Sequence, residues 1–510
     1  MSSLSAGDAH AIKDVVIVGA GFGGLCMAIK LLESGITNFV ILEKGDDVGG
    51  TWRDNSYPGC ACDVQSHLYS FSFEGNPDWS KRYAGWREIQ NYILHCTEKY
   101  GLRPYIRFQR EVTSATFNEQ QGLWSIKNNQ GETLLARHTV MASGPLHVPA
   151  TPKIKGLESF KGNVFHSARW DHSYSLQGKN VVSIGTGGSA IQYVPEIAPD
   201  VKQLYVFQRT PAWVIPRDER TYSPWNKSLF RQIPLLRKIH RDRLYWSNES
   251  RVWPIFHPSL AKAVHPLAKA FIKYQVKDPA LVKKLTPDYT FGCKRVLISN
   301  KYYPTFNRPN VELVTDGIRE IREHSIVTRD GIERPADCII LGTGFVVDPR
   351  IYMAGFELTG LGGRRIQDDW KDGAEAYFGI TVSGYPNLFQ LIGPNTALGH
   401  NSLIFMIEAQ VHYILECMKQ LKQKRAAYMD LKPQAQHDFN AEVQQHLKGT
   451  VWEGGCQSWY KLESGKNYTL WPWSTWKYWL RTRRVKTRDY HWVSCEQTAA
   501  TACPSPLTTA

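Results

Sequence analysis

Short apolar runs rich in β-branched residues alternate with helical stretches along this chain of 510 residues. Residues 15–18 and 39–42 have the pattern of buried parallel strands, because apolar residues occupy every position and not every second one. Between them, residues 25–34 form a predicted helix that Gly35 ends. The same order of strand, helix and strand recurs at residues 180–184, 191–197 and 204–207. This pattern predicts an α/β protein with two Rossmann-like βαβ units.

Other segments surround these units. Residues 139–144 and 339–344 are predicted strands that end in glycine turns and return the chain to the first and the second unit. Residues 215–290 are rich in aromatic and basic residues and include a helical stretch at 261–276, so we interpret them as a helical insertion that shields the active site. A long amphipathic helix is predicted at 402–424.

Each βαβ unit carries a glycine-rich loop after its first strand. The loops are Gly19-Ala20-Gly21-Phe22-Gly23-Gly24 and Gly185-Thr186-Gly187-Gly188-Ser189-Ala190. Glycines there let the backbone approach a pyrophosphate at the start of a helix. Glu43 ends the next strand, about 20 residues on, where a carboxylate binds a ribose hydroxyl. Arg209, before Thr210, holds the equivalent place in the second unit and suits a 2′-phosphate, which favours NADPH over NADH; a surface arginine is the alternative.

The composition, 42% hydrophobic and 21% charged, is typical of a soluble globular protein. No apolar run is long enough for a membrane span, and neither a secretory leader nor a C-terminal address is recognisable, so the expected compartment is the cytoplasm. A net charge of +14, with a basic cluster at 481–486, raises the question of nucleic acid, but no nucleic-acid-binding module accompanies it and a solvated basic face is favoured. The ten cysteines lack a metal-binding or disulfide framework and are expected to be reduced thiols.

Between the two loops stands Phe160-x-Gly162-x3-His166-x3-Trp170. In this position it resembles the fingerprint of type I Baeyer–Villiger monooxygenases. The resemblance extends over residues 14–480 and implies FAD and NADPH as cofactors, and insertion of one oxygen atom from O2 beside a ketone carbonyl to give an ester or lactone. We interpret the fingerprint as a hinge on the interdomain linker, with His166 coupling domain rotation to cofactor position and no direct catalytic role.

The sequence pattern and the resemblance together imply six segments. They are the first part of an FAD-binding domain (1–150), a linker with the first part of an NADP-binding domain (151–214), the helical insertion (215–290), the second part of the NADP-binding domain (291–345), the second part of the FAD-binding domain (346–493) and a disordered tail (494–510). The implied enzyme acts on a small-molecule ketone as a monomer or weak oligomer, without nucleic acid or an integral membrane segment.

The resemblance also assigns residues. Two stretches, 47–52 and 57–70, look like flavin-lining segments of the family, and the segment at 292–297 looks like its Lys-Arg segment. The family usually has Pro where Val296 stands, and many members have Arg where Cys60 or Ala61 stands. The expected FAD contacts are Gly19, Gly21, Gly24, Glu43, Gly50, Thr51, Trp52, Asp54, Ala61, Cys62, Asp63, Tyr69 and Val112. The expected NADP contacts are residues 185–190 (Gly185, Thr186, Gly187, Gly188, Ser189, Ala190), Arg209, Thr210 and Lys294, and no metal site is expected.

Arg295 and Asp63 are the expected catalytic residues. The reaction implied by the family uses a flavin C4a-peroxide that must remain an anion, and a fixed guanidinium stabilises such an anion without donating a proton. Asp63 is expected to orient Arg295 through a charge-assisted hydrogen bond. Three alternatives remain open: a flavin monooxygenase that hydroxylates nitrogen or sulfur, a disulfide oxidoreductase, for which Cys60-x-Cys62 has the wrong spacing, and a catalytically silent flavin-binding protein.

Overall fold

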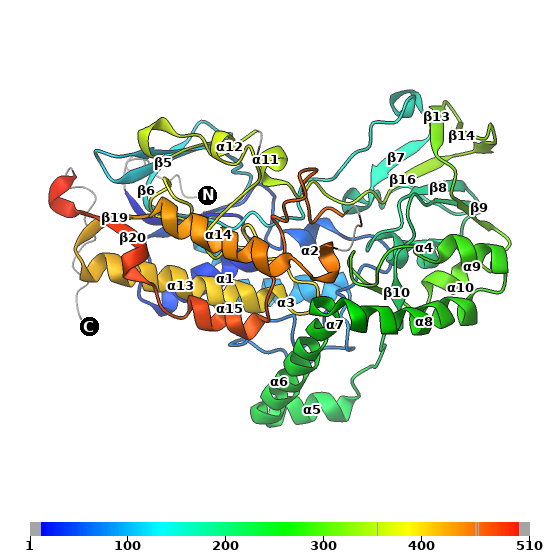
Figure 1. Cartoon of the computed structure of the whole chain (residues 1–510), viewed down its shortest axis with the longest axis horizontal. Helices are drawn as coiled ribbons and strands as arrows, with labels where there is room; N and C mark the ends of the chain where they lie inside the picture. Colours follow the sequence, from blue (N-terminus) through cyan, green and yellow to red (C-terminus); the bar gives the residue numbers. More distant parts are fainter. Residues whose placement is uncertain (1–11, 354, 454–455, 457, 499–510) are drawn as a thin grey trace.

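The computed structural model describes residues 12–353, 355–453, 456 and 458–498, and two sheets organise it (Figure 1). The first has eight strands in the order β17-β4-β5-β6-β1-β2-β3, with β18 also paired to β6. Its strands are β1 (Lys13–Val18), β2 (Phe39–Leu42), β3 (Ile106–Arg107), β4 (Val112–Asn118), β5 (Leu123–Asn128), β6 (Thr133–Met141), β17 (Glu357–Thr359) and β18 (Leu388–Gln390). The strands predicted at 15–18, 39–42 and 139–144 are therefore confirmed as β1, β2 and β6.

At the centre of this sheet, β1 pairs in parallel with β2 and β6. Val15, Val16 and Ile17 are fully buried because both faces of the sheet are covered, which is why residues 15–18 are apolar at every position. Helix α1 (Phe22–Glu33) packs between the sheet and α13 (Leu403–Gln423), the amphipathic helix expected at 402–424. Helix α1 begins three residues before the predicted start, inside the glycine loop.

The second sheet is entirely parallel, in the order β12-β9-β8-β16-β7. Its strands are β7 (Asn163–His166), β8 (Asn180–Ile184), β9 (Gln203–Phe207), β12 (Val311–Val314) and β16 (Cys338–Leu341), and α4 (Ala190–Ile197) connects β8 to β9. A small antiparallel sheet of β13 (Ile318–Arg322), β14 (Ser325–Thr328) and β15 (Glu333–Pro335) lies beyond it. The chain leaves the first sheet after β6, builds the second and returns to the first at β17.

The fingerprint segment belongs to the second sheet. Residues 163–166 form its edge strand β7, which pairs with β16, and Ser167–Arg169 form a short 3-10 helix. The segment expected to act as a linker is therefore part of a sheet, and its motion is tied to that sheet.

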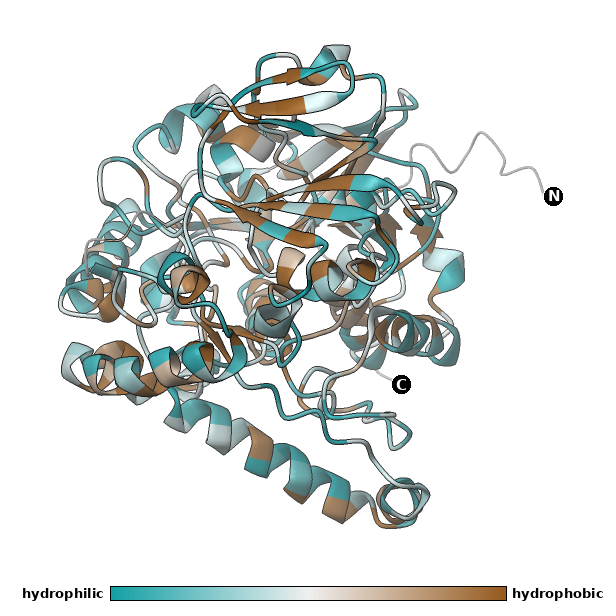
Figure 2. Ribbon diagram, turned by 90° about the vertical axis from the view of Figure 1, so that its right-hand side faces the viewer, coloured by the Kyte–Doolittle hydropathy of each residue, from teal (hydrophilic) through white to brown (hydrophobic). Residues whose placement is uncertain are grey.

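Residues 215–290 are largely helical. They form α5 (Pro224–Gln232), α6 (Pro234–Ser250), α7 (Val252–Phe256), α8 (Pro258–Gln275) and α9 (Pro279–Leu285), introduced by β10 (Val214–Ile215), which pairs with β11 (Leu297–Ile298). Helix α5 and the first half of α6 project from the body as an arm, the lowest part of the molecule in Figures 1 and 2. Residues 241–248 of α6 cover residues 65–70, because Arg241 donates to the carbonyls of His67 and Ser70 and Asn248 pairs with Gln65.

The remaining elements belong to the first domain, except α10. They are α2 (Thr51–Asp54), α3 (Trp86–Lys99), α10 (Tyr302–Thr305, in the second domain), α11 (Pro349–Tyr352), α12 (Ile366–Asp369), β19 (Ala426–Leu431), α14 (Pro433–Leu447), α15 (Thr475–Thr482) and β20 (Tyr490–Ser494). The start of the tail expected to be disordered is structured: Ser494 ends β20 and Cys495–Gln497 form a 3-10 helix, while residues 499–510 lie outside the described residues. Among the described helices, none is long and apolar enough to cross a membrane.

Candidate active site

A cavity opens at the carboxyl ends of β1 and β2, where an open parallel sheet binds its ligands. Nine of the expected FAD contacts line it: Gly19, Gly21, Glu43, Gly50, Thr51, Trp52, Asp54, Tyr69 and Val112. Ala61, Cys62 and Asp63 are not among its lining residues; they lie further along, toward the second domain. The cavity thus unites residues from the glycine loop, α2 and the start of β4.

The glycines of the first loop fit a bound dinucleotide for different reasons. A Cβ at Gly19 would lie 2.6 Å from the carbonyl oxygen of Ala142, and one at Gly24 would lie 1.9 Å from that of Gly19. Both glycines therefore permit close packing within the protein. At Gly21 the nearest atom would be the Cα of Gly50, at 3.9 Å, so the space in front of this backbone is open to a ligand. Gly24 therefore allows the helix to pack closely against Gly19 and does not line the cavity.

Glu43 is held by three donors. Its carboxylate accepts from the backbone N–H of Ala20 at 2.8 Å, from that of Gly45 at 2.8 Å and from Arg53 at 2.9 Å. A carboxylate has about four acceptor positions, so one remains for a ribose hydroxyl on the cavity side. The geometry of Glu43 therefore fits the role that the strand-end position indicated.

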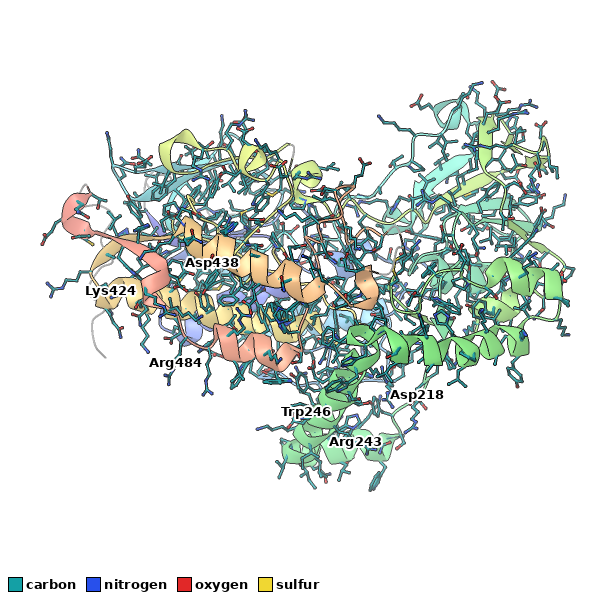
Figure 3. The ribbon with its side chains drawn as sticks, viewed as in Figure 1. Asp218, Arg243, Trp246, Lys424, Asp438 and Arg484 are labelled. Atoms are coloured by element: carbon teal, nitrogen blue, oxygen red, sulfur yellow. A yellow bond between two sulfur atoms is a disulfide. The ribbon has the colours of Figure 1, made fainter. Side chains whose placement is uncertain are left out.

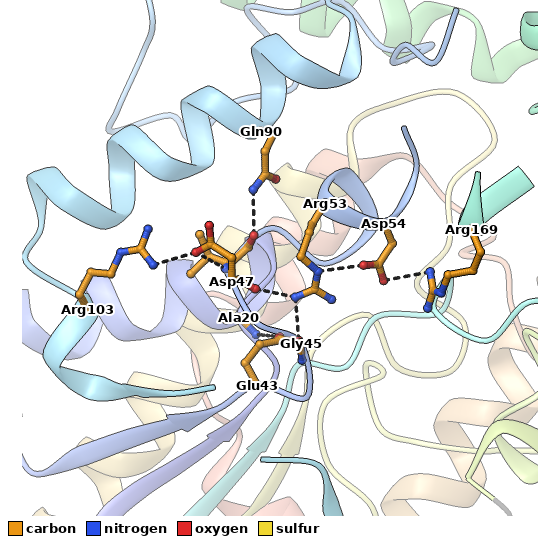
Figure 4. A network of polar contacts seen from close by, with 10 residues as sticks. Ala20, Glu43, Gly45, Asp47, Arg53, Asp54, Gln90, Arg103 and Arg169 are labelled. Atoms are coloured by element: carbon orange, nitrogen blue, oxygen red, sulfur yellow. Dashed lines mark hydrogen bonds and ion pairs between the residues drawn. The ribbon is translucent and has the colours of Figure 1, made fainter. Parts of the chain in front are cut away.

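Arg53 is at the centre of a polar network beside this cavity (Figure 4). It donates to Glu43, to the carbonyl of Asp47 at 2.5 Å and to Asp54 at 2.8 Å, and Arg103 donates to Asp47 at 2.7 Å. Burial lowers the pKa of Arg53, but the hydrogen bonds and charges of Asp54 and Glu43 outweigh it and raise that pKa overall. Sequence reasoning missed Arg53, because an arginine between two recognised motifs carries no signal of its own.

Further lining residues come from distant segments. Residues 142–147 follow β6 and form the glycine turn that the sequence suggested for a close backbone approach, while Leu403, Ile404 and Ile407 belong to the start of α13. The turn could have been found from its strand-to-glycine pattern. The α13 residues could not, because their pattern is that of any buried helix face.

The second glycine loop also leaves room for a ligand. A Cβ at Gly185 would lie 2.3 Å from the carbonyl oxygen of Gly342, whereas nothing lies within 4 Å of one at Gly187. Thr186 donates through its hydroxyl to the carbonyl of Thr210 at 3.3 Å, which ties the loop to the end of β9. The backbone at Gly187 therefore faces the open space that a pyrophosphate needs.

Two cations meet beside this loop. Burial and the charge of Arg209 lower the pKa of Lys294, so these side chains from β9 and the 292–297 segment lie near enough to repel each other. The Lys294 ammonium lies 4.9 Å from the ring centre of Tyr289. The charge of Asp288 offsets this effect only in part, and an anionic group, such as a 2′-phosphate, would relieve the remaining repulsion.

Arg295 and Asp63 form an ion pair across the two halves of the molecule. The Arg295 guanidinium lies 2.5 Å from Asp63 Oδ2, and the side chains are 43% and 31% exposed, respectively. The negative charge of Asp63 raises the pKa of Arg295 against the opposing effect of burial, so the guanidinium stays charged. The expected contact between these residues is thus confirmed, and 232 residues of sequence separate its partners.

The segment that carries Arg295 is fixed on both sides. Cys293 is buried and forms a disulfide with Cys456, and the N–H of Leu297 donates to the carbonyl of Trp213 at 2.9 Å. The expectation that all cysteines are thiols was wrong for this pair, because the fold brings together two residues 163 positions apart that have no motif spacing. Cys60 and Cys62 are free and buried, and burial raises the pKa of Cys60 to about 12, so they do not form a redox pair.

Gln192 of α4 joins the two domains near Asp63. Its side-chain amide donates to the carbonyl of Ala61 at 3.0 Å and accepts from the N–H of Ala61 at 3.2 Å and from the hydroxyl of Tyr57 at 3.0 Å. A polar side chain in a helix gives no sequence signal for such a contact. Gln192 therefore holds the backbone two residues before Asp63.

The fingerprint segment also reaches across to the first domain. Arg169 lies 3.5 Å from Asp54, and His172 contacts the hydroxyl of Ser56 at 2.7 Å. The ring of His166 lies 5.8 Å from that of Phe345, next to the glycine turn after β16, and burial lowers its pKa. These contacts place the segment against residues 54–56 of the first domain and beside the glycine turn after β16.

Two dinucleotide-binding sheets with an arginine–aspartate pair at their junction define a two-cofactor oxidoreductase. Residues 12–274 match the flavin-binding monooxygenase-like family. A Baeyer–Villiger monooxygenase of Pseudomonas aeruginosa is 46% identical over 480 residues, covering 94% of this chain and 91% of that protein, and one of Streptomyces coelicolor is 47% identical over 486 residues, covering 94% and 93%.

Solved structures agree with these matches. An oxidised steroid monooxygenase bound to NADP superimposes with a TM-score of 0.86 at 30% identity, covering 95% of this chain and all of that chain. Cyclohexanone monooxygenase from a Rhodococcus species bound to NADP+ gives a TM-score of 0.84 at 28% identity.

The chain therefore belongs to the Baeyer–Villiger monooxygenases of the flavin-binding monooxygenase-like family. It is an FAD- and NADPH-dependent enzyme that inserts one oxygen atom from O2 beside a ketone carbonyl. The product is an ester or a lactone. The α/β fold with two Rossmann-like domains is confirmed.

Proposed function

We propose that Arg295 is the catalytic cation of this monooxygenase and that Asp63 is the residue that positions it. The observation that carries the proposal is their ion pair of 2.5 Å at the junction of the two domains. Both side chains are partly exposed, so a substrate can reach the guanidinium while Asp63 fixes its direction.

The charge of this arginine is suited to the reaction. Asp63 raises the pKa of Arg295, so the side chain stabilises negative charge on oxygen and does not donate its proton. The disulfide at Cys293 and the hydrogen bond of Leu297 limit the movement of the segment that carries it. A cation fixed in advance stabilises a developing anion without reorganising during the reaction.

The cofactors would be held by residues of the two loops. FAD, which supplies the electron transfer and oxygen activation when bound, would lie in the cavity at Gly21, with its ribose on Glu43 and with Trp52 and Tyr69 on its walls. NADPH would lie on the loop that includes Gly187. Its 2′-phosphate would meet the cations of Arg209 and Lys294.

The segment boundaries, compartment and assembly are also part of the proposal. The FAD-binding domain comprises residues 1–150 and 346–493, the NADP-binding domain comprises 151–214 and 291–345, and the insertion lies between the two parts of the latter. We further propose a cytoplasmic monomer or weak oligomer that acts on a small-molecule ketone and not on nucleic acid.

Replacing Arg295 by Ala tests the catalytic role. The variant should keep bound FAD and NADPH-driven flavin reduction, because the residues that line the FAD cavity and the proposed NADPH contacts are unchanged. It should form no ester from a panel of linear, cyclic and aryl ketones. Product mass, which increases by one oxygen, and the hydrogen peroxide released per NADPH are measured together. The isosteric Asp63→Asn variant should show an intermediate loss of ester. Ketone oxygenation at the normal rate in Arg295→Ala would refute the assignment, and turnover of amines or sulfides in place of ketones by the parent enzyme would refute the substrate class.

A further inference from the structure

Most of the exposed large apolar side chains fall in two segments of the chain. Of the fifteen exposed large hydrophobic residues in the described part of the chain, nine fall within residues 225–274 and three within 476–480. The former lie on or beside α5, α6, α7 and α8, and the latter on α15. Tyr245 of α6 contacts Thr475 of α15 through their hydroxyls at 2.9 Å, so α6 and α15 are neighbours. Figure 3 shows Trp246 and Arg243 on α6 and Arg484 just beyond α15, all on the lower side of the molecule.

On α6 the exposed apolar residues form a row. Leu235, Ile239 and Trp246 are 63%, 53% and 59% exposed, and their spacing of four and seven residues places them on one face of the helix. Lys238 and Arg243 are exposed on either side of this row. The row is not covered by any described part of the chain. One exposed acidic residue, Asp242, lies beside the row.

Helix α8 repeats the arrangement. Leu260, Leu267 and Tyr274, spaced by seven residues, are 47%, 72% and 88% exposed, whereas Ala261, Ala268 and Ile272 turn toward the body. Three exposed lysines, Lys262, Lys269 and Lys273, accompany the apolar row on the solvent side. An amphipathic helix of a globular domain normally has its apolar side buried. Helix α8 has a second apolar row that the fold leaves in solvent.

Positive charge is concentrated in the same segment. Residues 215–290 contain fifteen Lys and Arg against six Asp and Glu, a net charge of +9 out of the +14 of the whole chain. On α15, Lys477 lies 5.7 Å from the ring of Trp476, and Arg483 lies 4.7 Å from that of Trp479. Exposed tryptophans with adjacent cations are the side chains that settle at the boundary of headgroups and acyl chains.

We propose that the arm surface, formed by the exposed apolar rows of α6 and α8 and by Trp476, Trp479 and Leu480 of α15, docks on an anionic phospholipid membrane. Lipid acyl chains bury the aliphatic and aromatic side chains, and anionic headgroups neutralise the flanking Lys and Arg residues. The protein lies on the membrane and does not span it.

Charge selects this partner over two others. A second copy of the chain would bring together two segments that each have a net charge of +9, and the mutual repulsion opposes such a contact. A nucleic acid would pair with the cations but would leave the aliphatic row of Leu235 and Ile239 in water. An anionic bilayer satisfies both properties of the surface.

Cosedimentation with vesicles tests the proposal without any ketone, so its failure is distinct from a failure of the proposed activity. The purified holoenzyme should bind vesicles of phosphatidylcholine that contain about one-third phosphatidylglycerol, bind vesicles of phosphatidylcholine alone much more weakly, and dissociate at high salt. Each basic side chain near the surface contributes about fivefold in the partition coefficient, so Lys238→Glu with Arg243→Glu should reduce binding by at least about 30-fold.

The apolar row is tested by Ile239→Ser with Trp246→Ser, which should reduce vesicle binding by at least about tenfold. The matched control is Ile332→Ser with Lys153→Glu, at exposed positions of the second domain, and it should bind as the parent does. Thermal unfolding checks that each variant is folded, and sedimentation velocity reports self-association. Binding that is independent of anionic lipid, or equal losses in control and arm variants, would overturn the proposal. The proposal would also be overturned if removal of the apolar row changed the oligomeric state and left vesicle binding unchanged.

Discussion

Arg209 is expected to decide the choice between NADPH and NADH. Arg209 follows the end of β9, where a Rossmann domain binds the adenine ribose of its dinucleotide. Together with burial, its charge lowers the pKa of the neighbouring Lys294. Replacing Arg209 by Ala removes one of the two cations while leaving the glycine loop and Lys294 in place. The pyrophosphate contacts of both nucleotides should therefore be unchanged.

The magnitude follows from the environment of the side chain. A hydrogen bond to a charged group contributes about 1.5–3 kcal/mol, which corresponds to about 10–150-fold in affinity. Arg209 is exposed and screened by solvent, and its removal also relieves its repulsion of Lys294, so the lower end of that range applies. We expect the dissociation constant of NADPH to rise about tenfold. That of NADH, which has no 2′-phosphate, should change by less than about twofold.

The assay is an equilibrium titration of the holoenzyme with each nucleotide, together with kcat/KM for flavin reduction. Arg308→Ala, an exposed arginine before the amino end of β12, is the matched control and should affect neither nucleotide. Equal losses for NADPH and NADH in Arg209→Ala would show that the 2′-phosphate binds elsewhere, and that reasoning from the strand end fails for this chain.

Three further outcomes are expected. Lys294 must be protonated to bind a phosphate, and its pKa is lowered, so the KM for NADPH should begin to rise at a lower pH than an ordinary lysine would cause. Lys294→Arg should flatten this pH profile of KM. An unchanged profile in that variant would contradict the role of Lys294. Cys456→Ser removes the disulfide to Cys293 and should lower the free energy of unfolding by about 2–4 kcal/mol, and reductant should destabilise the parent enzyme in the same way. Alkylation of Cys293 and Cys456 in the untreated protein, identified by peptide mass, would show that the bond does not form. Gln192→Leu leaves the N–H and carbonyl of Ala61 without their side-chain partner and should lower the free energy of unfolding by about 1–3 kcal/mol. The variant should also release more hydrogen peroxide per NADPH consumed. An unchanged free energy of unfolding and an unchanged peroxide yield would exclude a positioning role for Gln192.

Much of the fold could be predicted from sequence because its signals are local. A parallel strand buried on both faces is apolar at every position, and a glycine loop must follow it within a few residues, so both βαβ units were recognisable. The boundaries differ where packing decides them, as at α1, which starts at Phe22 because Gly24 allows the helix to lie against Gly19.

The candidate site was predictable only in part. Glu43 and Arg209 stand at strand ends whose position in the motif indicates their partners, and the family resemblance pointed to Asp63 and Arg295. Arg53 could not have been found, because its role depends on the carboxylates of Glu43 and Asp54 and the carbonyl of Asp47, which converge on it only in the folded chain.

The sequence by itself determined the fold class, the two dinucleotide loops and the family, because each depends on residues close together in the chain. Only the tertiary structure decided that Cys293 meets Cys456, that Gln192 holds Ala61, and that the apolar rows of α6 and α8 face solvent. An apolar row at helical spacing is the same pattern whether it is buried or exposed. The packing of neighbouring elements, which depends on contacts far apart in sequence, selects between the two.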